Sequence, residues 1–463
     1  MVITRFAPSP TGYLHIGGLR TALYSYLWAK KNDGKFLLRI EDTDLKRNSK
    51  EAADAIEEAF KWVGLKQDGD IYYQSDRMDI YKSYIQKLLD EDKAYYCYMS
   101  KDELDELRAT QMKNKQRPRY DRRYRNFTGS VPDVKPVVRI KTPVNEIIKF
   151  DDGIKGMISV NTDEVMDDFI IARSDGSPTY NFVVAIDDHE MGVTEVIRGD
   201  DHLSNTPKQI IVYRALGFDL PKFYHVPMIL NPNGKKLSKR DGAMDVMEYK
   251  KEGYLPEALL NFLVRLGWSH KDQEIFSFKE MLELFNPKDI NKSASAYNAE
   301  KLLWLNSNFI KNSSYERLIK ELKFFDLNLE NIEKKEILID ALRERAKTLK
   351  EFAEKSRLIL NEPQDYDQKA VKKFLKAEAI EIAKEFLNYL TVYKEDLNNS
   401  NDYEVCISKF LEEKNLKLKN IAQIIRISIV GSAVSPSIYD IMAIVGQNEL
   451  IKRIKKLIKF MEV

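Results

Sequence analysis

The beginning of this chain places an apolar segment, a turn and two adjacent glycines directly before a helical pattern. Residues 1–6 are mostly apolar, residues 8–12 read Pro-Ser-Pro-Thr-Gly, and His15-Ile16-Gly17-Gly18 precedes an apolar helical run at residues 19–31. A helix that begins there presents unpaired N–H groups and the positive end of its dipole, which favour an anion. Glycines permit close backbone approach, and a histidine can donate a hydrogen bond to phosphate. The pattern therefore predicts a strand, an anion-binding turn and a helix.

A second cationic segment lies about half the chain further on. It reads Lys236-Leu237-Ser238-Lys239-Arg240 and follows the apolar run at residues 224–230 and the Asn-Pro-Asn-Gly turn at residues 231–234. Its two lysines offer mobile donors to the same triphosphate. Either segment alone is more often a structural turn or a solvated loop. In this order the two segments indicate chemistry on ATP, with Mg²⁺ held mainly by phosphate oxygens and water.

The two segments in this order resemble the signature motifs of class I aminoacyl-tRNA synthetases. Four further runs are similar to bacterial glutamyl-tRNA synthetases, and they lie at residues 5–12, 39–44, 178–182 and 198–202. The resemblance extends from residue 2 to about residue 310, and the run at residues 431–436 resembles the tail of that family. The implied fold is α/β: a Rossmann-like nucleotide-binding catalytic domain with an α+β insertion, a stem-contact region and an all-α anticodon-binding part.

Composition is that of an ordinary globular protein. The 463 residues are 43% hydrophobic and 32% charged, and their net charge of +2 leaves nucleic-acid binding to local patches. No apolar run approaches the length of a membrane span and no secretory leader is visible, so we expect a cytoplasmic protein that does not bind a membrane. We also expect a monomer that does not bind DNA. Cys97 and Cys406 predict no disulfide framework.

Periodicity and resemblance together divide the chain into five segments. Residues 1–70 have a βαβ pattern with a strand at 36–40 and an amphipathic helix at 49–63, and the catalytic domain is expected to resume with a strand at 182–186 and to end at residue 240. Residues 71–181, with a helix near 81–92 and a strand near 137–142, correspond to the family's acceptor-arm insertion. Residues 241–310 correspond to its stem-contact region. Residues 311–463 are poor in Gly and Pro and have helical spacing, which predicts a helical anticodon-binding region.

The tail separates this chain from its close relatives. Glutaminyl-tRNA synthetases carry β-barrel anticodon domains, which would give alternating strands and frequent turn signals. The Lys- and Glu-rich tail lacks that pattern. A truncated paralogue that glutamylates a modified tRNA base would lack the tail altogether.

The resemblance assigns roles to particular residues. It implies that His15 contacts the α-phosphate of ATP, that Gly17 and Gly18 admit the nucleotide, and that Lys236, Ser238, Lys239 and Arg240 hold the departing phosphates. For glutamate it implies a site that pairs two carboxylates and one ammonium group, because buried charge without a partner is costly. The residues that match this site are Arg5, Ser9, Glu41, Tyr180 and Arg198.

At two places the sequence departs from the family pattern, so the corresponding residue roles are not assigned to this chain. Val184 stands where some members carry an asparagine near the substrate. Some relatives hold a zinc ion in the insertion, but the corresponding positions here are Cys97, Met99, Tyr124 and Asn126. A tetrahedral site needs about four nitrogen or sulfur ligands, so no structural zinc is predicted.

Candidate tRNA contacts come from basic segments. Residues 108–125 hold eight Lys or Arg against a single acid and include two tyrosines, which suits phosphate contact and base stacking. A solvated charged helix explains this composition as well. The basic run at 450–460 is amphipathic, so packing accounts for it equally. The tRNA candidates are Asp44, Arg47, Arg117, Arg119, Arg122 and Arg426.

The implied activity is ATP-dependent ligation of L-glutamate to the 3′ end of tRNA through a glutamyl adenylate. Charging of tRNA(Gln) as well as, or instead of, tRNA(Glu), to feed a later amidation, stays open. Two other classes of protein are alternatives. A smaller adenylyl-transferring enzyme would share His15 but needs no helical tail. A catalytically inactive RNA-binding paralogue has no reason to keep His15, Lys236 and Lys239 together.

Overall fold

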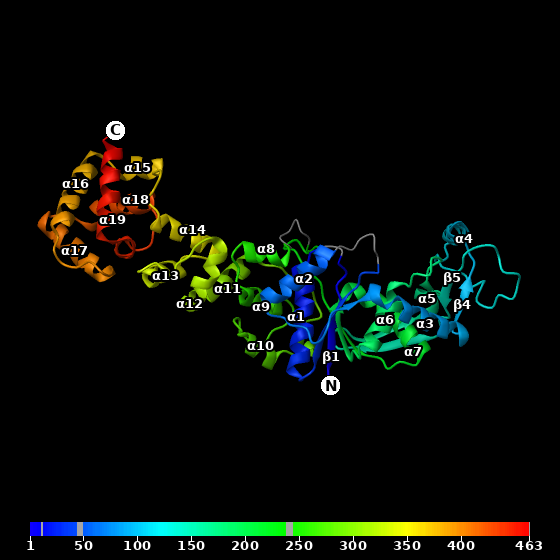
Figure 1. The fold of residues 1–463 in the computed structure, drawn as a ribbon. Coiled ribbons are helices and arrows are strands. Elements are labelled where there is room, and N and C mark those ends of the chain that lie inside the picture. Colours follow the sequence, from blue (N-terminus) through cyan, green and yellow to red (C-terminus); the bar gives the residue numbers. More distant parts are fainter. Residues whose placement is uncertain (11–12, 44–49, 238–243, 463) are drawn as a thin grey trace. The chain divides into compact units, whose positions relative to one another are not determined.

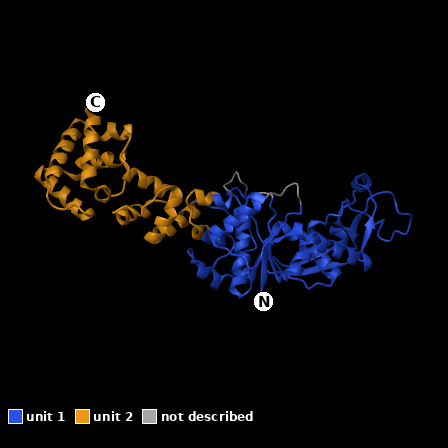
Figure 2. Ribbon diagram, viewed as in Figure 1, with its two compact units in different colours: residues 1–247, 260–299 blue, residues 248–259, 300–463 orange. Residues whose placement is uncertain are grey.

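The computed structural model describes residues 1–10, 13–43, 50–237 and 244–462 of the chain. The predicted site residues Asp44, Arg47, Ser238, Lys239 and Arg240 lie outside these ranges. The chain forms two compact units (Figure 2). Unit 1 contains residues 1–247 and 260–299, and unit 2 contains residues 248–259 and 300–463. Residues 241–310, expected as one stem-contact region, are thus divided between the units.

The chain begins with the predicted βαβ arrangement (Figure 1). Strand β1 (Ile3–Phe6) leads through helix α1 (Ile16–Lys31) to strand β2 (Lys35–Ile40), which pairs parallel to β1 with Ile3 opposite Lys35. The predicted helix at 19–31 and strand at 36–40 are confirmed. The amphipathic run forms α2 (Lys50–Val63), and β3 (Tyr72–Tyr73) extends the sheet parallel to β2.

A second sheet in unit 1 has the strand order β7, β6, β10, β9. Strand β9 (Glu195–Gly199) leads through α7 (Thr206–Leu216) to the parallel strand β10 (Lys222–Val226), and β6 (Ile147–Asp152) lies parallel on the far side of β10. Strand β7 (Gly156–Asn161) forms a hairpin with β6. The N–H of Thr194, just before β9, donates to the carbonyl of Ile3 in β1 at 2.9 Å. The sheet of β1, β2 and β3 therefore meets the parallel strands of the second sheet at β1 and β9.

The predicted strand at residues 182–186 is wrong, because these residues lie in helix α6 (Tyr180–Glu190). The run Phe-Val-Val-Ala-Ile is rich in β-branched residues, and a short apolar run of this kind has no period that separates strand from helix. All five side chains are buried. A helix that is apolar on every side is one covered by its neighbours, so the surrounding packing decides the conformation here.

The remainder of residues 71–181 combines three helices with a small sheet. Helices α3 (Met78–Asp90), α4 (Lys101–Lys113) and α5 (Thr162–Val165) accompany an antiparallel sheet of order β4 (Ala94–Cys97), β5 (Val137–Ile140), β8 (Ile170–Ala172). The expected helix near 81–92 and strand near 137–142 are present. Unit 1 also contains α10 (Phe278–Leu284) and β12 (Ser295–Ala296), which pairs with β11 (Ile229–Leu230). The boundary between the units falls within helices α8 (Val246–Lys251) and α9 (Pro256–Arg265).

Unit 2 is helical in all its described elements beyond residue 300, as the tail predicts. Its helices are α11 (Ala299–Lys311), α12 (Tyr315–Leu322), α13 (Lys335–Arg343), α14 (Leu349–Leu360), α15 (Gln368–Phe374), α16 (Ala377–Val392), α17 (Ser400–Glu413), α18 (Leu418–Val430) and α19 (Ile438–Met461). One continuous apolar core runs through them. Side-chain oxygens of Ser314, Thr348, Asp367 and Asn399 cap four of the helices. None of the described helices is long and apolar enough to span a bilayer.

Candidate active site

Nine of the predicted site residues line one cavity of about 590 Å³ in unit 1. The cavity lies where β1, β2 and β9 end, beside the first turn of α1 and the first turn of α6. Ligands bind at the carboxyl ends of parallel strands in folds of this kind. The nine residues are Arg5, Ser9, His15, Gly17, Gly18, Glu41, Tyr180, Arg198 and Lys236.

His15 caps the N-terminus of α1. Its Nδ1 accepts a hydrogen bond from the N–H of Gly18 at 3.1 Å. A neutral imidazole that accepts at Nδ1 carries its proton on Nε2. A Cβ added to Gly17 would lie 3.0 Å from His15 Nδ1, and one added to Gly18 would lie 2.9 Å from Leu14. Side chains at these two positions would therefore crowd His15 and Leu14, which explains why glycine suits the first turn of α1.

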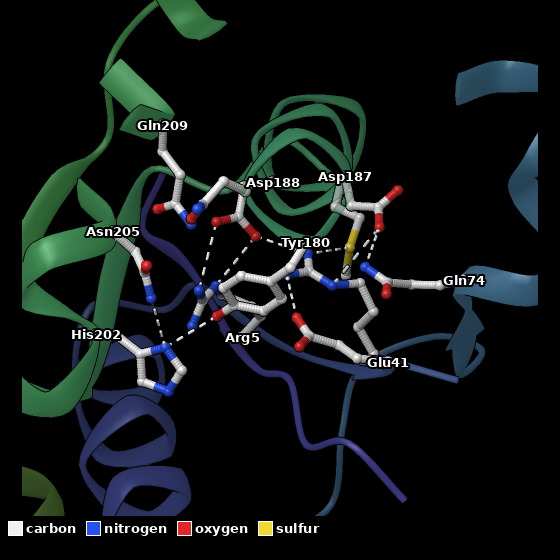
Figure 3. Close-up of polar contacts among 12 residues, drawn as sticks. Arg5, Glu41, Gln74, Tyr180, Asp187, Asp188, His202, Asn205 and Gln209 are labelled. Carbon is white, nitrogen blue, oxygen red and sulfur yellow. Dashed lines mark hydrogen bonds and ion pairs between the residues drawn. The ribbon is translucent and has the colours of Figure 1, made fainter. Parts of the chain in front are cut away.

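Arg5 and Arg198 enter the cavity with different partners. Arg5 in β1 donates from Nε and Nη2 to the carboxylate of Asp188 in α6, at 3.1 and 3.4 Å (Figure 3). Arg198 in β9 donates from Nε to His225 and from Nη2 to the hydroxyl of Thr206, at 3.1 and 2.7 Å. Its Nη1 is buried and has no hydrogen-bond partner in the described part of the chain. Such an unpaired donor is costly unless a ligand accepts from it.

Glu41, directly after β2, supplies a buried negative charge to the cavity, which Asp201 also lines. Its Oε1 accepts from Nη2 of Arg39 at 3.3 Å, and Arg39 also donates to Asp188 at 2.6 Å. Burial raises the pKa of Glu41 above its usual range, and Arg39 and Arg5 oppose this rise. A second cation placed against this carboxylate would stabilise its ionised form.

Tyr180 begins α6, and its side chain lies beside that of His202 (Figure 3); both residues line the cavity. The tyrosine hydroxyl lies 3.0 Å from Nδ1 of His202, and Asn205 Nδ2 lies 3.4 Å from the same nitrogen. Burial and then the nearby Arg198 lower the pKa of His202 to about 4, so its ring is neutral at physiological pH. Burial raises the pKa of Tyr180, which therefore keeps its proton. The pair thus contributes polar, uncharged groups to a cavity that already holds several charges.

The two remaining predicted residues are more exposed. Ser9 lines the cavity on the segment after β1. Lys236 lines the opposite edge, and its Nζ lies 3.5 Å from the carboxylate of Asp201. Val184 is buried in α6 and is not among the described residues that line the cavity.

The sequence reasoning missed the acidic pair at the end of α6. Asp187 accepts from Gln74, Arg77 and Tyr81 at 2.8–3.0 Å, while Asp188 accepts from Arg5 and Arg39. Both carboxylates are buried. The signal in the sequence is an Asp-Asp pair directly after a fully apolar run. It indicates buried charge only when that run is known to form a helix covered by its neighbours.

The predicted tRNA residues of the insertion have partners within the protein. Arg117 donates to the carbonyl of Val165, Arg119 to the carbonyl of Asp163, and Arg122 pairs with Asp163 and Asp168. An RNA phosphate would have to share these donors. In unit 2, Arg426 donates to the hydroxyl of Ser435, next to the Gly431 turn.

The four positions that correspond to a zinc knuckle do not form a metal donor set. Cys97 and Met99 are buried with Tyr95 and Tyr120 in a small apolar cluster, against which Tyr124 packs. One thiol and one thioether do not fit a tetrahedral zinc site. In the described residues, no three His, Cys, Asp or Glu side chains gather as a metal-binding group.

A parallel α/β unit with an anion-binding helix terminus, followed by a helical unit, has the architecture of a class I aminoacyl-tRNA synthetase. A family model described as tRNA synthetases class I (E and Q), catalytic domain, matches residues 1–304, and an anticodon binding domain matches residues 299–458. Glutamate–tRNA ligase 2 of Nitratiruptor sp. is 65% identical to this chain, and that of Campylobacter concisus is 60% identical, with 99% of each chain covered.

Solved structures give the same result. The glutamate tRNA ligase of Elizabethkingia meningosepticum, crystallised with its amino acid, has a TM-score of 0.89 at 35% identity, and that of Elizabethkingia anophelis has 0.84 at 35%. Each comparison covers 99% of both chains. The chain belongs to the glutamate–tRNA ligases, and the family predicted from its motifs is confirmed.

Proposed function

We propose that this chain ligates L-glutamate to the 3′ end of tRNA in two steps that pass through a glutamyl adenylate. The observation that carries the proposal is the single cavity that combines Arg5, Arg198 and Glu41 with His15 and Lys236. This set supports the proposal, because it offers opposite charges to an amino acid that has two carboxylates and one ammonium group, beside a helix N-terminus of the kind that favours an anion.

Glutamate recognition divides between cations and one carboxylate. The unpaired Nη1 of Arg198 suits one substrate carboxylate, and the remaining N–H groups of Arg5 add to the positive side of the cavity. Glu41 suits the ammonium group, because a cation offsets the burial that raises the pKa of Glu41. The hydroxyls of Tyr180 and Ser9 supply further polar contacts.

In the first step, the α-carboxylate of glutamate attacks the α-phosphate of ATP in line and expels pyrophosphate. The chain supplies positioning and charge stabilisation rather than a covalent nucleophile. The Nε2–H of His15 donates to the α-phosphate as charge builds there, and the glycines at 17 and 18 leave room for the nucleotide. Lys236 exchanges Asp201 for the departing phosphates, and we assign Ser238, Lys239 and Arg240, which follow it in the sequence, to the same phosphates. Mg²⁺ would accompany ATP and would supply shielding of the phosphate charge, with phosphate oxygens and water as its expected ligands.

In the second step, a hydroxyl of the terminal ribose of tRNA attacks the adenylate and releases AMP. We assign residues 1–70 and 182–240 to catalysis, 71–181 to the acceptor arm, 241–310 to the stem and 311–463 to the anticodon. Candidate RNA contacts are Asp44, Arg47, Arg117, Arg119, Arg122 and Arg426. The protein acts in the cytoplasm as a monomer.

The test is aminoacylation with labelled glutamate and ATP, run in parallel on purified tRNA(Glu) and tRNA(Gln). Charging of tRNA(Glu) alone identifies a discriminating enzyme. Charging of tRNA(Gln) identifies one that also feeds amidation of the attached glutamate. Charging of neither tRNA by a folded protein would refute the proposal and favour an inactive RNA-binding paralogue.

A further inference from the structure

Beneath the cavity, four segments meet around the side chain of Arg198. Asp152 ends β6, His225 lies in β10, Arg198 lies in β9 and Thr206 begins α7. All four residues are buried, His225 and Thr206 completely. Parallel pairing places Arg198 and His225 directly opposite each other on neighbouring strands.

The hydrogen bonds in this group fix the tautomer of His225. Its Nδ1 lies 2.5 Å from Oδ2 of Asp152, whose Oδ1 accepts from the backbone N–H groups of Ile154 and Lys155 at 3.0 and 2.8 Å. A carboxylate only accepts, so Nδ1 carries the proton and Nε2 presents a lone pair. Nε2 lies 3.1 Å from Nε of Arg198 and 3.0 Å from the hydroxyl of Thr206. Since that hydroxyl accepts from Arg198 Nη2, its own proton is directed to His225.

Two of the three nitrogens of Arg198 are thereby held by neutral groups, and Nη1 alone is left without a partner among the described residues. Arg5, in contrast, is paired with the carboxylate of Asp188. In the described ranges, Arg198 has no carboxylate within ion-pair distance. Its charge is therefore the one that a ligand has to balance.

We propose that His225 is a positioning residue for glutamate recognition: held in its Nδ1–H form by Asp152, it accepts from Nε of Arg198 and orients Nη1 toward a substrate carboxylate. A neutral acceptor fixes the guanidinium group and leaves its positive charge available to the substrate. A carboxylate partner would neutralise that charge. The proposal rests on the role of Arg198 as a carboxylate ligand given under Proposed function.

Asp152→Asn tests the tautomer directly. We expect the amide oxygen to keep the Oδ1 position, where the backbone N–H groups of Ile154, Lys155 and His225 donate at 3.0, 2.8 and 3.3 Å. The amide nitrogen then faces His225 Nδ1. The ring then carries its proton on Nε2 and opposes the N–H of Arg198, as the same substitution does in other carboxylate–histidine pairs. We expect the KM for glutamate to rise about 10- to 100-fold, the range for loss of a hydrogen bond to a charged group, with the KM for ATP and for tRNA within about twofold.

Three further variants complete the experiment. Glu195→Gln is the matched control, because Glu195 is a buried carboxylate at the start of β9, the strand of Arg198, and its partners are Trp28 and Lys222. The KM of this variant for glutamate should not change. His225→Leu, which lacks an acceptor, should raise this KM as Asp152→Asn does. His225→Gln restores an acceptor oxygen and should recover part of the loss.

The proposal is overturned if folded Asp152→Asn and His225→Leu retain the wild-type KM for glutamate, or if the KM for ATP rises equally. Arg198→Lys separates failure of the positioning role of His225 from failure of the carboxylate-binding role of Arg198. An unchanged KM for glutamate in this variant would refute the proposed role of Arg198 itself. If the variants do not fold, ¹⁵N spectra of histidine-labelled wild-type protein decide instead. One of the five histidines should show the Nδ1–H tautomer across neutral pH, and its absence would contradict the proposal.

Discussion

Replacing Asp188 by Asn removes the carboxylate that holds two arginines at the base of the cavity. Arg5 Nε and Arg39 Nη1 donate to its Oδ1 at 3.1 and 2.6 Å, and the side chains of Asp188 and Arg39 are 3% and 0% exposed. In the variant, an amide with half the acceptor capacity faces two guanidinium groups. Both cations lose a charged partner in a region that water does not reach.

The expected cost is that of breaking a buried ion pair, about 3–5 kcal/mol, and solvent screening does not reduce it at this depth. That is a large part of the roughly 5–15 kcal/mol by which native domains are stable. In calorimetry we expect the unfolding midpoint of the unit that contains Asp188 to fall by roughly 5–15 °C. The KM for glutamate should rise as well, because Arg5 is no longer held.

The effect also has a defined pH dependence. Burial alone would raise the pKa of Asp188, but Arg5 and Arg39 outweigh it and keep that pKa below its usual range. A carboxyl group with a lowered native pKa contributes stability above its unfolded pKa of about 3.9, and this contribution is lost as pH falls through the native pKa. The stability difference between wild type and Asp188→Asn should therefore be constant above about pH 5 and shrink in more acidic solution.

The control is Asp79→Asn, because the side chain of Asp79 is 97% exposed and forms a surface ion pair with Lys82 one helical turn away. This change should alter stability by no more than about 0.5 kcal/mol. The reasoning is refuted if Asp188→Asn costs no more than Asp79→Asn, or if its effect does not vary with pH.

Three other predictions concern the chemistry and the insertion. His15→Asn keeps an oxygen that can cap α1 but loses the Nε2 donor. Glutamate activation should therefore slow about 10²–10³-fold with little change in stability. Unchanged activation would show that His15 takes no part in the reaction. Exchange of pyrophosphate into ATP with glutamate should be negligible until tRNA is added, as the family resemblance implies, and rapid exchange without RNA would contradict this. Incubation with a strong zinc chelator should leave the unfolding midpoint unchanged, because the cluster around Cys97 and Tyr120 is apolar; a midpoint that falls on chelation and recovers with zinc would show a structural metal.

Local sequence was enough for much of the fold. The helix at 19–31 and the strand at 36–40 each have a clear period and are bounded by turn residues, so both were predictable. Residues 182–186 were not, because an apolar run of five has no period and only the elements that cover α6 on all sides make it a helix.

The candidate site was predictable only through its motifs. Arg5, Glu41, Tyr180 and Arg198 are far apart in the sequence, and their resemblance to one family is what brought them together before the cavity was known. The supporting residues carry no such signal. His225 and Asp152 are 73 positions apart and meet only because β6 and β10 become neighbours in the sheet. For the arginines of the insertion the role in RNA binding stays a prediction, since a composition that suits RNA also suits carbonyl and carboxylate partners within the protein.

The central claim is that the cavity is built for an amino acid with two carboxylates. Its most direct test is charging of tRNA(Glu) with glutamate, glutamine and aspartate at equal concentrations, compared by kcat/KM. Nη1 of Arg198 has no partner among the described residues, and we assign it to the side-chain carboxylate of glutamate. Glutamine should therefore be disfavoured by at least about 10²-fold, and aspartate, one methylene shorter, should also be charged poorly. Charging of glutamine at a rate near that of glutamate would contradict the account.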